Sequence, residues 1–325
     1  MRTLLRGAVA ALLALPLFLT SSPPAQAAPA STPLAMASGF YVDPNSSPAV
    51  WAAANPGDGR ASAIRDSIAN TPMARWFGSW SGDIRSAVGS YVGAAQSADK
   101  LPLLVAYNMY GRDACGGHSG GGAPSPSAYA SWIAAFAGGI GGRPAVVVLE
   151  PDALGDYSCM SQAQIVERQN MLVNALSQLR SNAPNAWVYL DGGNPGWIDA
   201  STMADRLNAS GLGLARGFSL NVSNYFRTDE NASYANSVNQ ALRQRHGYTR
   251  PFVVDTSRNG NGSNGEWCNP GGRRIGTPTQ QGGSGAEMLL WLKTPGESDG
   301  NCGVGSGSTA GQFLPEVAYR MIYGY

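Results

Sequence analysis

The sequence is poor in charged residues and in histidine. Asp, Glu, Lys and Arg make up 13% of the 325 residues, the formal net charge at pH 7 is +1, and two histidines are present. Without clusters of Lys and Arg, a nucleic acid or another polyanion is not an expected partner. Such a surface has to rely on Gly, Ser, Asn and Gln, which suits an extracellular protein that handles a neutral ligand.

Cysteine is also scarce. The sequence has four cysteines, no Cys-x-x-Cys pair and few histidines to complete a metal site, so a zinc site is disfavoured. All four lie in segments rich in Gly, Ser and Asn, which favours disulfides that tie loops in an oxidising compartment. Four cysteines allow three pairings, and the sequence alone does not choose among them.

Long apolar runs are missing after the amino terminus. Residues 8–19 form an apolar stretch behind a basic start, too short to span a bilayer, and residues 25–27 (Ala-Gln-Ala) match the cleavage pattern of a secretory signal peptide. We expect residues 1–27 to be removed on export and residues 28–37 to form a disordered leader. The protein is therefore predicted to be secreted and extracellular, with no membrane association afterwards. A membrane anchor is the alternative, and it would need a longer apolar run.

What the rest of the chain does contain is an alternation of short apolar runs with helical segments. The absence of repeats and linkers predicts a single catalytic domain over residues 38–325. Strand–helix alternation predicts a parallel sheet, and seven or eight strands over this length favour a distorted parallel β/α barrel (TIM-like) of the α/β class. Asp83 and Ser161 stand where helix N-caps are expected. The predicted strands are 39–42, 75–78, 101–107, 145–150, 187–191, 217–220, 251–255 and 287–292, and the predicted helices are 83–98, 126–137, 161–180, 201–208 and 230–245.

Several predicted strands end in an acidic residue. The run 145–149 leads into Glu150-Pro151-Asp152, and two later strands end in Asp191 and Asp255. Because active sites of parallel barrels lie at the carboxyl ends of their strands, we expect these acids to gather at one rim.

Acidic and aromatic residues share this predicted rim. Aromatic rings stack on the apolar faces of sugars, and glycosidic cleavage needs one carboxylic acid and a second carboxylate, so a carbohydrate site is favoured. For any single residue a simpler explanation exists: Asp is often a turn former, Trp often packs in a core, and Asp191 or Asp255 could pair with a basic side chain. The candidates are Asp113, Asp152, Asp191, Glu297 and Asp299, with Trp76, Tyr107, Trp197 and Trp267.

Six ordered sequence blocks resemble glycoside hydrolase family 6, the inverting cellulases. The match runs from about Gly39 to the carboxyl terminus, and so many blocks in order make coincidence very improbable. The blocks are Tyr107-Asn-Met-Tyr-Gly-Arg-Asp113, Val148-Leu-Glu-Pro-Asp152, Leu190-Asp-Gly-Gly-Asn194, Asp255-Thr-Ser-Arg-Asn-Gly-Asn-Gly262, Glu266-Trp-Cys-Asn269 and Trp291-Leu-Lys-Thr-Pro-Gly-Glu-Ser-Asp-Gly300.

The resemblance implies a distorted β/α barrel that hydrolyses β-1,4-glucosidic bonds with inversion, without metal or cofactor. It makes Asp152 the proton donor and Asp113 the neighbouring carboxylate that raises the pKa of the donor and organises water. Asp299 matches the family's disputed catalytic base, with Arg258 and Lys293 as its cationic partners. Such partners keep Asp299 ionised but lower its basicity, so a water relay from the Asp113 side is at least as plausible.

The resemblance also implies the substrate contacts and the disulfides Cys115–Cys159 and Cys268–Cys302. Three positions depart from the family pattern: Asn194 stands where histidine is common, Ala114 is an extra residue before Cys115, and Gly120 occupies the position of the loop serine that positions water, for which Ser119 could substitute. The implied substrate-binding residues are Trp76, Tyr107, Ser119, Asp191, Asn194, Trp197, Asn221, Arg258, Trp267, Lys293 and Glu297.

The activity expected is that of an endo-1,4-β-glucanase acting on β-1,4-glucan as a monomer. The segments between Cys115 and Cys159 and between Cys268 and Cys302 look too short for the loops that roof the cleft of exo-acting relatives. An exo-acting cellobiohydrolase is the alternative within the family. A glucan-binding barrel without activity is the alternative of another class, and the intact set Asp113, Asp152 and Asp299 argues against it.

Overall fold

The computed structural model describes residues 33–116 and 120–325, within a unit that spans Ser31–Tyr325. The predicted signal peptide, residues 28–32 of the predicted leader, and the candidate Ser119 lie outside the described residues. The described part of the predicted disordered leader contains the short 3₁₀ helix Pro33–Met36. In the part of the chain that is described, no helix combines the length and apolar character needed to cross a bilayer.

Eight strands form one curled sheet in the order β1-β2-β3-β4-β5-β6-β8-β7. All neighbours are parallel except β7, which is antiparallel to β8. Ala74, just before β1, donates its N–H to the carbonyl of Trp291, just after β8, at 2.8 Å, so the sheet nearly closes. The predicted distorted β/α barrel is confirmed. The strands are β1 (Arg75–Phe77), β2 (Leu103–Ala106), β3 (Ala145–Leu149), β4 (Ala186–Asp191), β5 (Gly217–Leu220), β6 (Phe252–Asp255), β7 (Gln280–Gln281) and β8 (Met288–Leu290).

The parallel strands are buried on both faces because their side chains alternate between two apolar layers. In β2, Leu103 and Val105 belong to the layer inside the barrel, whereas Leu104 and Ala106 pack in the layer beneath the helices. This alternation explains why the strands read as continuous apolar runs in the sequence.

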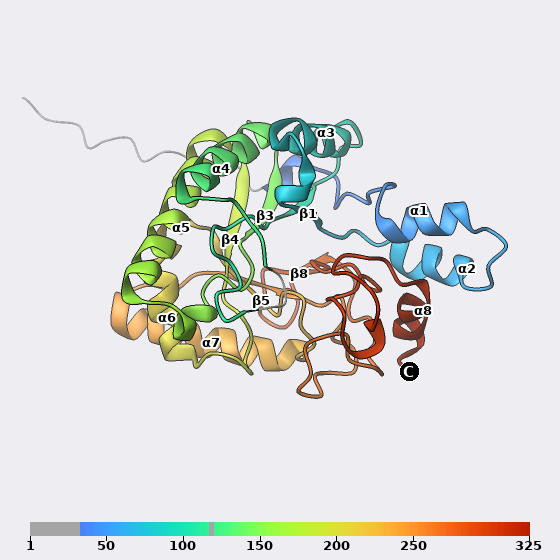
Figure 1. The fold of residues 1–325 in the computed structure, drawn as a ribbon. Helices are drawn as coiled ribbons and strands as arrows, with labels where there is room; N and C mark the ends of the chain where they lie inside the picture. Colours follow the sequence, from blue (N-terminus) through green and yellow to red (C-terminus); the bar gives the residue numbers. More distant parts are fainter. Residues whose placement is uncertain (1–32, 117–119) are drawn as a thin grey trace, which may run out of the picture. The chain divides into compact units, whose positions relative to one another are not determined.

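Five long helices cover the outside of the sheet in chain order (Figure 1). Two short helices, α1 (Ser47–Ala54) and α2 (Ala61–Ile64), lie beside α8 (Pro315–Tyr323) (Figure 1). Buried Ile64, Trp291 and Ala318 form a separate small core there. The five long helices are α3 (Ile84–Ser97), α4 (Pro126–Ile140), α5 (Gln162–Asn182), α6 (Ala200–Ala209) and α7 (Thr228–His246).

The structure corrects the prediction at the two ends of the domain. The strand predicted at 39–42 is a single bridge between Phe40 and Leu101, because the chain turns away after one pair. Helices α1, α2 and α8 and strand β7 were not predicted. The first three are short and are stabilised by contacts between chain segments far apart in the sequence, which local periodicity does not report.

Both predicted helix caps are present. Asp83 accepts a hydrogen bond from the Ser86 N–H at the start of α3. At the start of α5, Ser161 accepts from the Gln164 N–H while the Gln164 side chain accepts from the Ser161 N–H at 2.8 Å, which completes a capping box.

We predict that Ser161→Ala lowers the free energy of unfolding by about 1 kcal/mol, because it leaves the first turn of α5 without its side-chain acceptor. Urea denaturation monitored by circular dichroism measures the change. Ser177→Ala is the matched control, since the Ser177 hydroxyl only donates to the Val173 carbonyl within the same helix, and it should cost less than about 0.5 kcal/mol. Equal losses in the two variants would contradict the role of the cap.

Candidate active site

A cavity of about 1090 Å³ opens where the parallel strands end. Its lining brings together residues from five of the six sequence blocks that were singled out, and the block Asp255–Gly262 contributes none. The predicted residues that line it are Trp76, Tyr107, Asp113, Asp152, Asn194, Trp197, Trp267, Lys293, Glu297 and Asp299.

Three predicted substrate-binding residues do not line this cavity. Asn221 is fully buried, and its amide donates to the Asp255 carbonyl at 2.8 Å. Asp191 and Arg258 are also buried, and their side chains contact residues of the cavity wall from behind. We therefore assign these three side chains to holding the site rather than to binding a ligand.

Buried acids at strand ends hold the neighbouring loops through backbone N–H groups. Glu150, after β3, accepts from Asn108 and Met109, which follow β2, at 2.9 to 3.0 Å. Asp191, at the end of β4, accepts from the Asp152 N–H at 3.0 Å. The rim is thus tied together strand by strand.

Asp255, at the end of β6, has the same role on the other side of the rim. It accepts from the N–H of Ser223, which follows β5, at 3.0 Å, and from those of Leu292 and Lys293, which follow β8, at 3.2 and 3.1 Å. Neither Asp191 nor Asp255 forms a salt bridge with a basic side chain in the described part of the chain, although Arg258 interacts electrostatically with Asp255.

The segment at the end of β3 has a strained backbone. Glu150 and Asp152 have φ angles of +48° and +69°, and Asp113 has +56°. Left-handed conformations are costly for residues other than glycine, and they concentrate at functional sites. At this point they turn Asp152 into the cavity while Glu150 faces the core.

The environment of Asp152 favours its protonated form. Burial raises the pKa of this carboxyl well above its usual range, and the negative charges of Asp191, Asp156, Asp113 and Asp299 raise it further. An aspartic acid that keeps its proton near neutral pH can serve as a general acid.

Asp299 is in the opposite situation. Burial alone would raise its pKa, but Arg258 and Lys293 outweigh this effect and hold the pKa of Asp299 below its usual value. Arg258 Nη1 lies 2.9 and 3.0 Å from the two carboxylate oxygens, and Lys293 Nζ lies at 3.8 Å. The Tyr225 hydroxyl donates to Asp299 at 3.2 Å, so this carboxylate is ionised and its oxygens are in use.

Aromatic side chains form the walls of the cavity. Trp76 and Tyr107 meet edge to face with their ring centroids 5.2 Å apart, and the Trp76 indole N–H donates to the Leu292 carbonyl at 2.7 Å. Trp197 rests on Gly155, where a β-carbon would come within 1.9 Å of the indole ring. Trp197 and Trp267 remain 39% and 43% exposed, as sugar-stacking platforms need to be.

Trp80 and Arg112 are among the cavity residues that sequence reasoning missed. Trp80 is 57% exposed and lines the cavity three residues after β1. The Arg112 guanidinium lies 4.3 Å from the centroid of the Tyr107 ring and 5.7 Å from that of the Trp80 ring, between the two. Arg112 stands inside the Tyr107–Asp113 motif, and an aromatic residue shortly after a strand end was the signal available for Trp80.

The four cysteines form two disulfides, Cys115–Cys159 and Cys268–Cys302. The first joins the segment that follows Asp113 to the segment that follows Asp152. The second joins the segments that carry Trp267 and Asp299. Each disulfide therefore fixes a cavity loop, and the pairing is the one implied by the resemblance.

A protonated and an ionised carboxylate in an aromatic cleft on a β/α barrel define a glycoside hydrolase. The comparison with known proteins agrees: residues 35–323 match the family model for glycosyl hydrolases family 6. The chain belongs to this family and is a cellulase-type hydrolase.

Relatives and solved structures of the same family are similar over most of the chain. Endoglucanase 1 of Streptomyces halstedii is 72% identical over 321 residues, 99% of both chains. Endoglucanase A of Thermobispora bispora is 45% identical over 87% of this chain and 61% of its own length. An endoglucanase of Mycobacterium tuberculosis, solved with methyl-cellobiosyl-4-deoxy-4-thio-β-D-cellobioside, is 39% identical with a TM-score of 0.82, covering 90% of this chain and 99% of that chain.

We predict that Asp191→Asn flattens the dependence of stability on pH. Burial raises the pKa of Asp191 to about 6, above the value of about 3.9 of an unfolded chain, so its contribution to stability is complete below about pH 4 and is lost as the pH rises through 6. Calorimetric melting temperatures from pH 4 to 7 measure the effect. The wild type should lose more stability over this range than the variant, and parallel curves would contradict the assignment.

Proposed function

We propose that this protein is a secreted endo-1,4-β-glucanase that cleaves internal bonds of cellulose or related β-glucans with inversion. The single observation that carries the proposal is the contrast between Asp152, whose pKa is raised, and Asp299, whose pKa is lowered, in one cavity. Inverting hydrolysis needs a protonated carboxyl on one side of the bond and a water-activating group on the other. The three relatives named above are endoglucanases, whereas relatives named as exoglucanase or cellobiohydrolase are 31% identical or less, which supports internal cleavage.

Asp152 donates its proton to the glycosidic oxygen in this proposal. Asp113 lies in the same cavity, and its negative charge helps to keep Asp152 protonated until the bond breaks. Tyr107, which lines the cavity beside Trp76, presses on the sugar ring at the cleavage point and favours a distorted conformation. Trp76, Trp197 and Trp267 are the platforms for the flanking glucose units.

Asp299 acts mainly as a fixed negative charge. The contacts with Arg258 and Tyr225 that keep it ionised also reduce its ability to take a proton from water. A negative charge held near the positive charge that develops on the sugar stabilises the transition state. We assign the organisation of the attacking water to the Asp113 side of the cavity.

We further propose that residues 1–27 direct secretion and that residues 38–325 act as a monomeric catalytic domain with β-1,4-glucan as the partner. The apolar stretch 8–19 and the Ala-Gln-Ala sequence at 25–27 support the first part. Amino-terminal sequencing of the exported protein tests the cleavage site.

We predict that Asp152→Asn lowers kcat by about 10²–10⁴-fold on carboxymethyl-cellulose, because the amide has no proton to donate. Binding of a cello-oligosaccharide, measured by calorimetry, should persist, since the platforms are untouched. Asp205→Asn is the control: Asp205 is exposed on α6 and pairs with Arg245 and His246 outside the cavity, so its kcat should remain that of the wild type. Near-normal activity of Asp152→Asn would contradict the assignment of Asp152 as the proton donor.

The mode and the stereochemistry of cleavage are predicted independently of that variant. The wild type should cause a rapid fall in the viscosity of carboxymethyl-cellulose, and fresh product ends should be α-configured by proton NMR. Almost pure cellobiose as the first product would instead identify an exo-acting enzyme, and β-configured ends would refute inversion.

A further inference from the structure

Arg168 is a buried cation of α5 to which the proposed mechanism gives no role. It is 1% exposed, yet its guanidinium reaches the backbone of two cavity segments. Nη1 donates to the Ala153 carbonyl at 3.1 Å, and Nη2 donates to the Gly111 carbonyl. Ala153 directly follows Asp152, and Gly111 stands two residues before Asp113. One rigid group thus joins the segments that carry the two acids.

Two buried carboxylates hold the same 107–115 segment at other points. Asp156 accepts from the Ala114 N–H at 3.0 Å, directly after Asp113. Glu150 accepts from Met109 at 2.9 Å, nearer to Tyr107. Both carboxylates and Tyr157 interact electrostatically with Arg168, so this segment lies on a network of buried charges of both signs.

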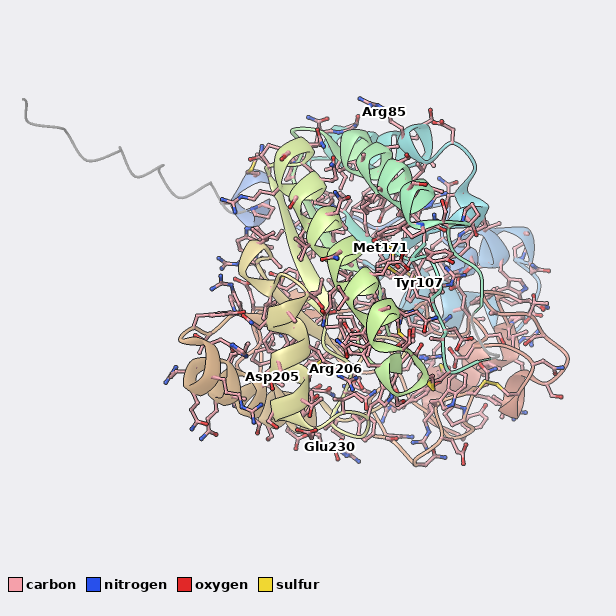
Figure 2. The ribbon with its side chains drawn as sticks, turned by 60° about the vertical axis from the view of Figure 1, so that its left-hand side comes forward. Arg85, Tyr107, Met171, Asp205, Arg206 and Glu230 are labelled. Atoms are coloured by element: carbon pink, nitrogen blue, oxygen red, sulfur yellow. A yellow bond between two sulfur atoms is a disulfide. The ribbon has the colours of Figure 1, made fainter. Side chains whose placement is uncertain are left out.

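A second arginine, Arg206, contacts only one of the two cavity segments and serves as a comparison with Arg168. Arg206, on α6, donates to the Leu154 and Gly155 carbonyls at 2.5 and 3.2 Å and lies over the Tyr157 ring. Figure 2 labels Arg206 on α6 and Met171 on α5, and Met171 is one helical turn from Arg168. Arg206 therefore holds the loop after the donor, whereas Arg168 also holds the 107–115 segment.

We propose that Arg168 is a positioning residue that fixes the separation of Asp113 and Asp152 by joining the Gly111 and Ala153 carbonyls. This inference rests on the proposed function, in which Asp152 is the proton donor and Asp113 its neighbour. A planar fork with several donors reaches two carbonyls at once, which a single ammonium group does not.

The separation of the two acids matters because their repulsion depends on distance. Four carboxylates interact with Asp152: Asp191 at the end of β4, Asp156 and Asp113 near the disulfide Cys115–Cys159, and Asp299 across the cavity. Arg168 holds the segment that carries one of these four carboxylates, Asp113. If the 107–115 segment moves away, the repulsion from Asp113 weakens and Asp152 gives up its proton at lower pH.

The first experiment compares Arg168→Lys and Arg168→Met with the matched control Arg143→Lys. Arg143 is half-buried and donates to the Ile140, Gly89 and Gly139 carbonyls, before β3 at the opposite end of the sheet. Both Arg168 variants should lose about 10- to 100-fold in kcat, as misplacement by about 1 Å can cause. The pH at which kcat/KM falls on the alkaline side should move down, while oligosaccharide affinity stays that of the wild type.

Arg143→Lys should lower the melting temperature and leave the pH profile and kcat as in the wild type. If Arg168→Lys behaves in the same way, Arg168 is merely structural and the proposal is overturned. Should Arg168→Met fail to fold, Arg168→Lys, which keeps the charge and most of the volume, carries the test.

A double-mutant comparison with Asp113→Asn distinguishes a role of Arg168 in positioning Asp113 from a general loss of structure. Asp113→Asn alone should move the alkaline limb of kcat/KM to lower pH. In the Arg168→Lys background the same change should move it less, because Asp113 is already displaced. Equal shifts in both backgrounds overturn the proposal. If the wild type does not hydrolyse β-1,4-glucan at all, the proposed function fails. If the wild type is active and Arg168→Lys has the same pH profile as the wild type, only the positioning role of Arg168 fails.

Discussion

The site depends on keeping carboxyl groups out of water at the carboxyl ends of parallel strands. Burial of a charged carboxylate is costly unless hydrogen bonds or opposite charges compensate for it. Glu150, Asp191 and Asp255 obtain part of this compensation from the backbone N–H groups of neighbouring loops, and burial still raises the pKa of each. These buried acids therefore fix the positions of the loops around the cavity.

Asp152 and Asp299 differ in protonation because of what surrounds them. Asp152 lies among carboxylates, so burial and repulsion act in the same direction and keep its proton in place. Asp299 lies beside Arg258 and Lys293, so burial is outweighed and the charge is retained. One cavity thus holds an acid and an anion of the same residue type, which is the chemical requirement for cleaving a glycosidic bond without a metal.

Local sequence patterns predict the barrel well, and long-range packing explains what they miss. The apolar runs at 145–150 and 217–220 coincide with β3 and β5, because strands buried on both faces show a continuous signal. The helices α1, α2 and α8 depend on contacts across the chain, such as those of Ile64 with the small core that contains Trp291 and Ala318.

The candidate site follows the same division. Asp152, just after β3, and the aromatic residues of the cavity were found from sequence, and the family resemblance suggested their roles. Asn221 was expected to bind substrate from the resemblance to the family, but its burial is a property of the fold. Arg168 lies in the middle of a helix and meets Gly111 only after folding, so no local pattern could have revealed it.

The most direct test of the account is a carbon-13 NMR titration of the wild type and Asp152→Asn with labelled aspartate carboxyl groups. Labelling aspartate alone excludes Glu150, whose pKa burial raises to about 7. The account predicts one carboxyl in the wild type that still carries its proton well above the ordinary aspartate pKa of about 4 and whose signal is absent from the variant. Loss of a signal that titrates at or below about 4 would contradict it, because Asp152 would then be ionised when it should donate a proton.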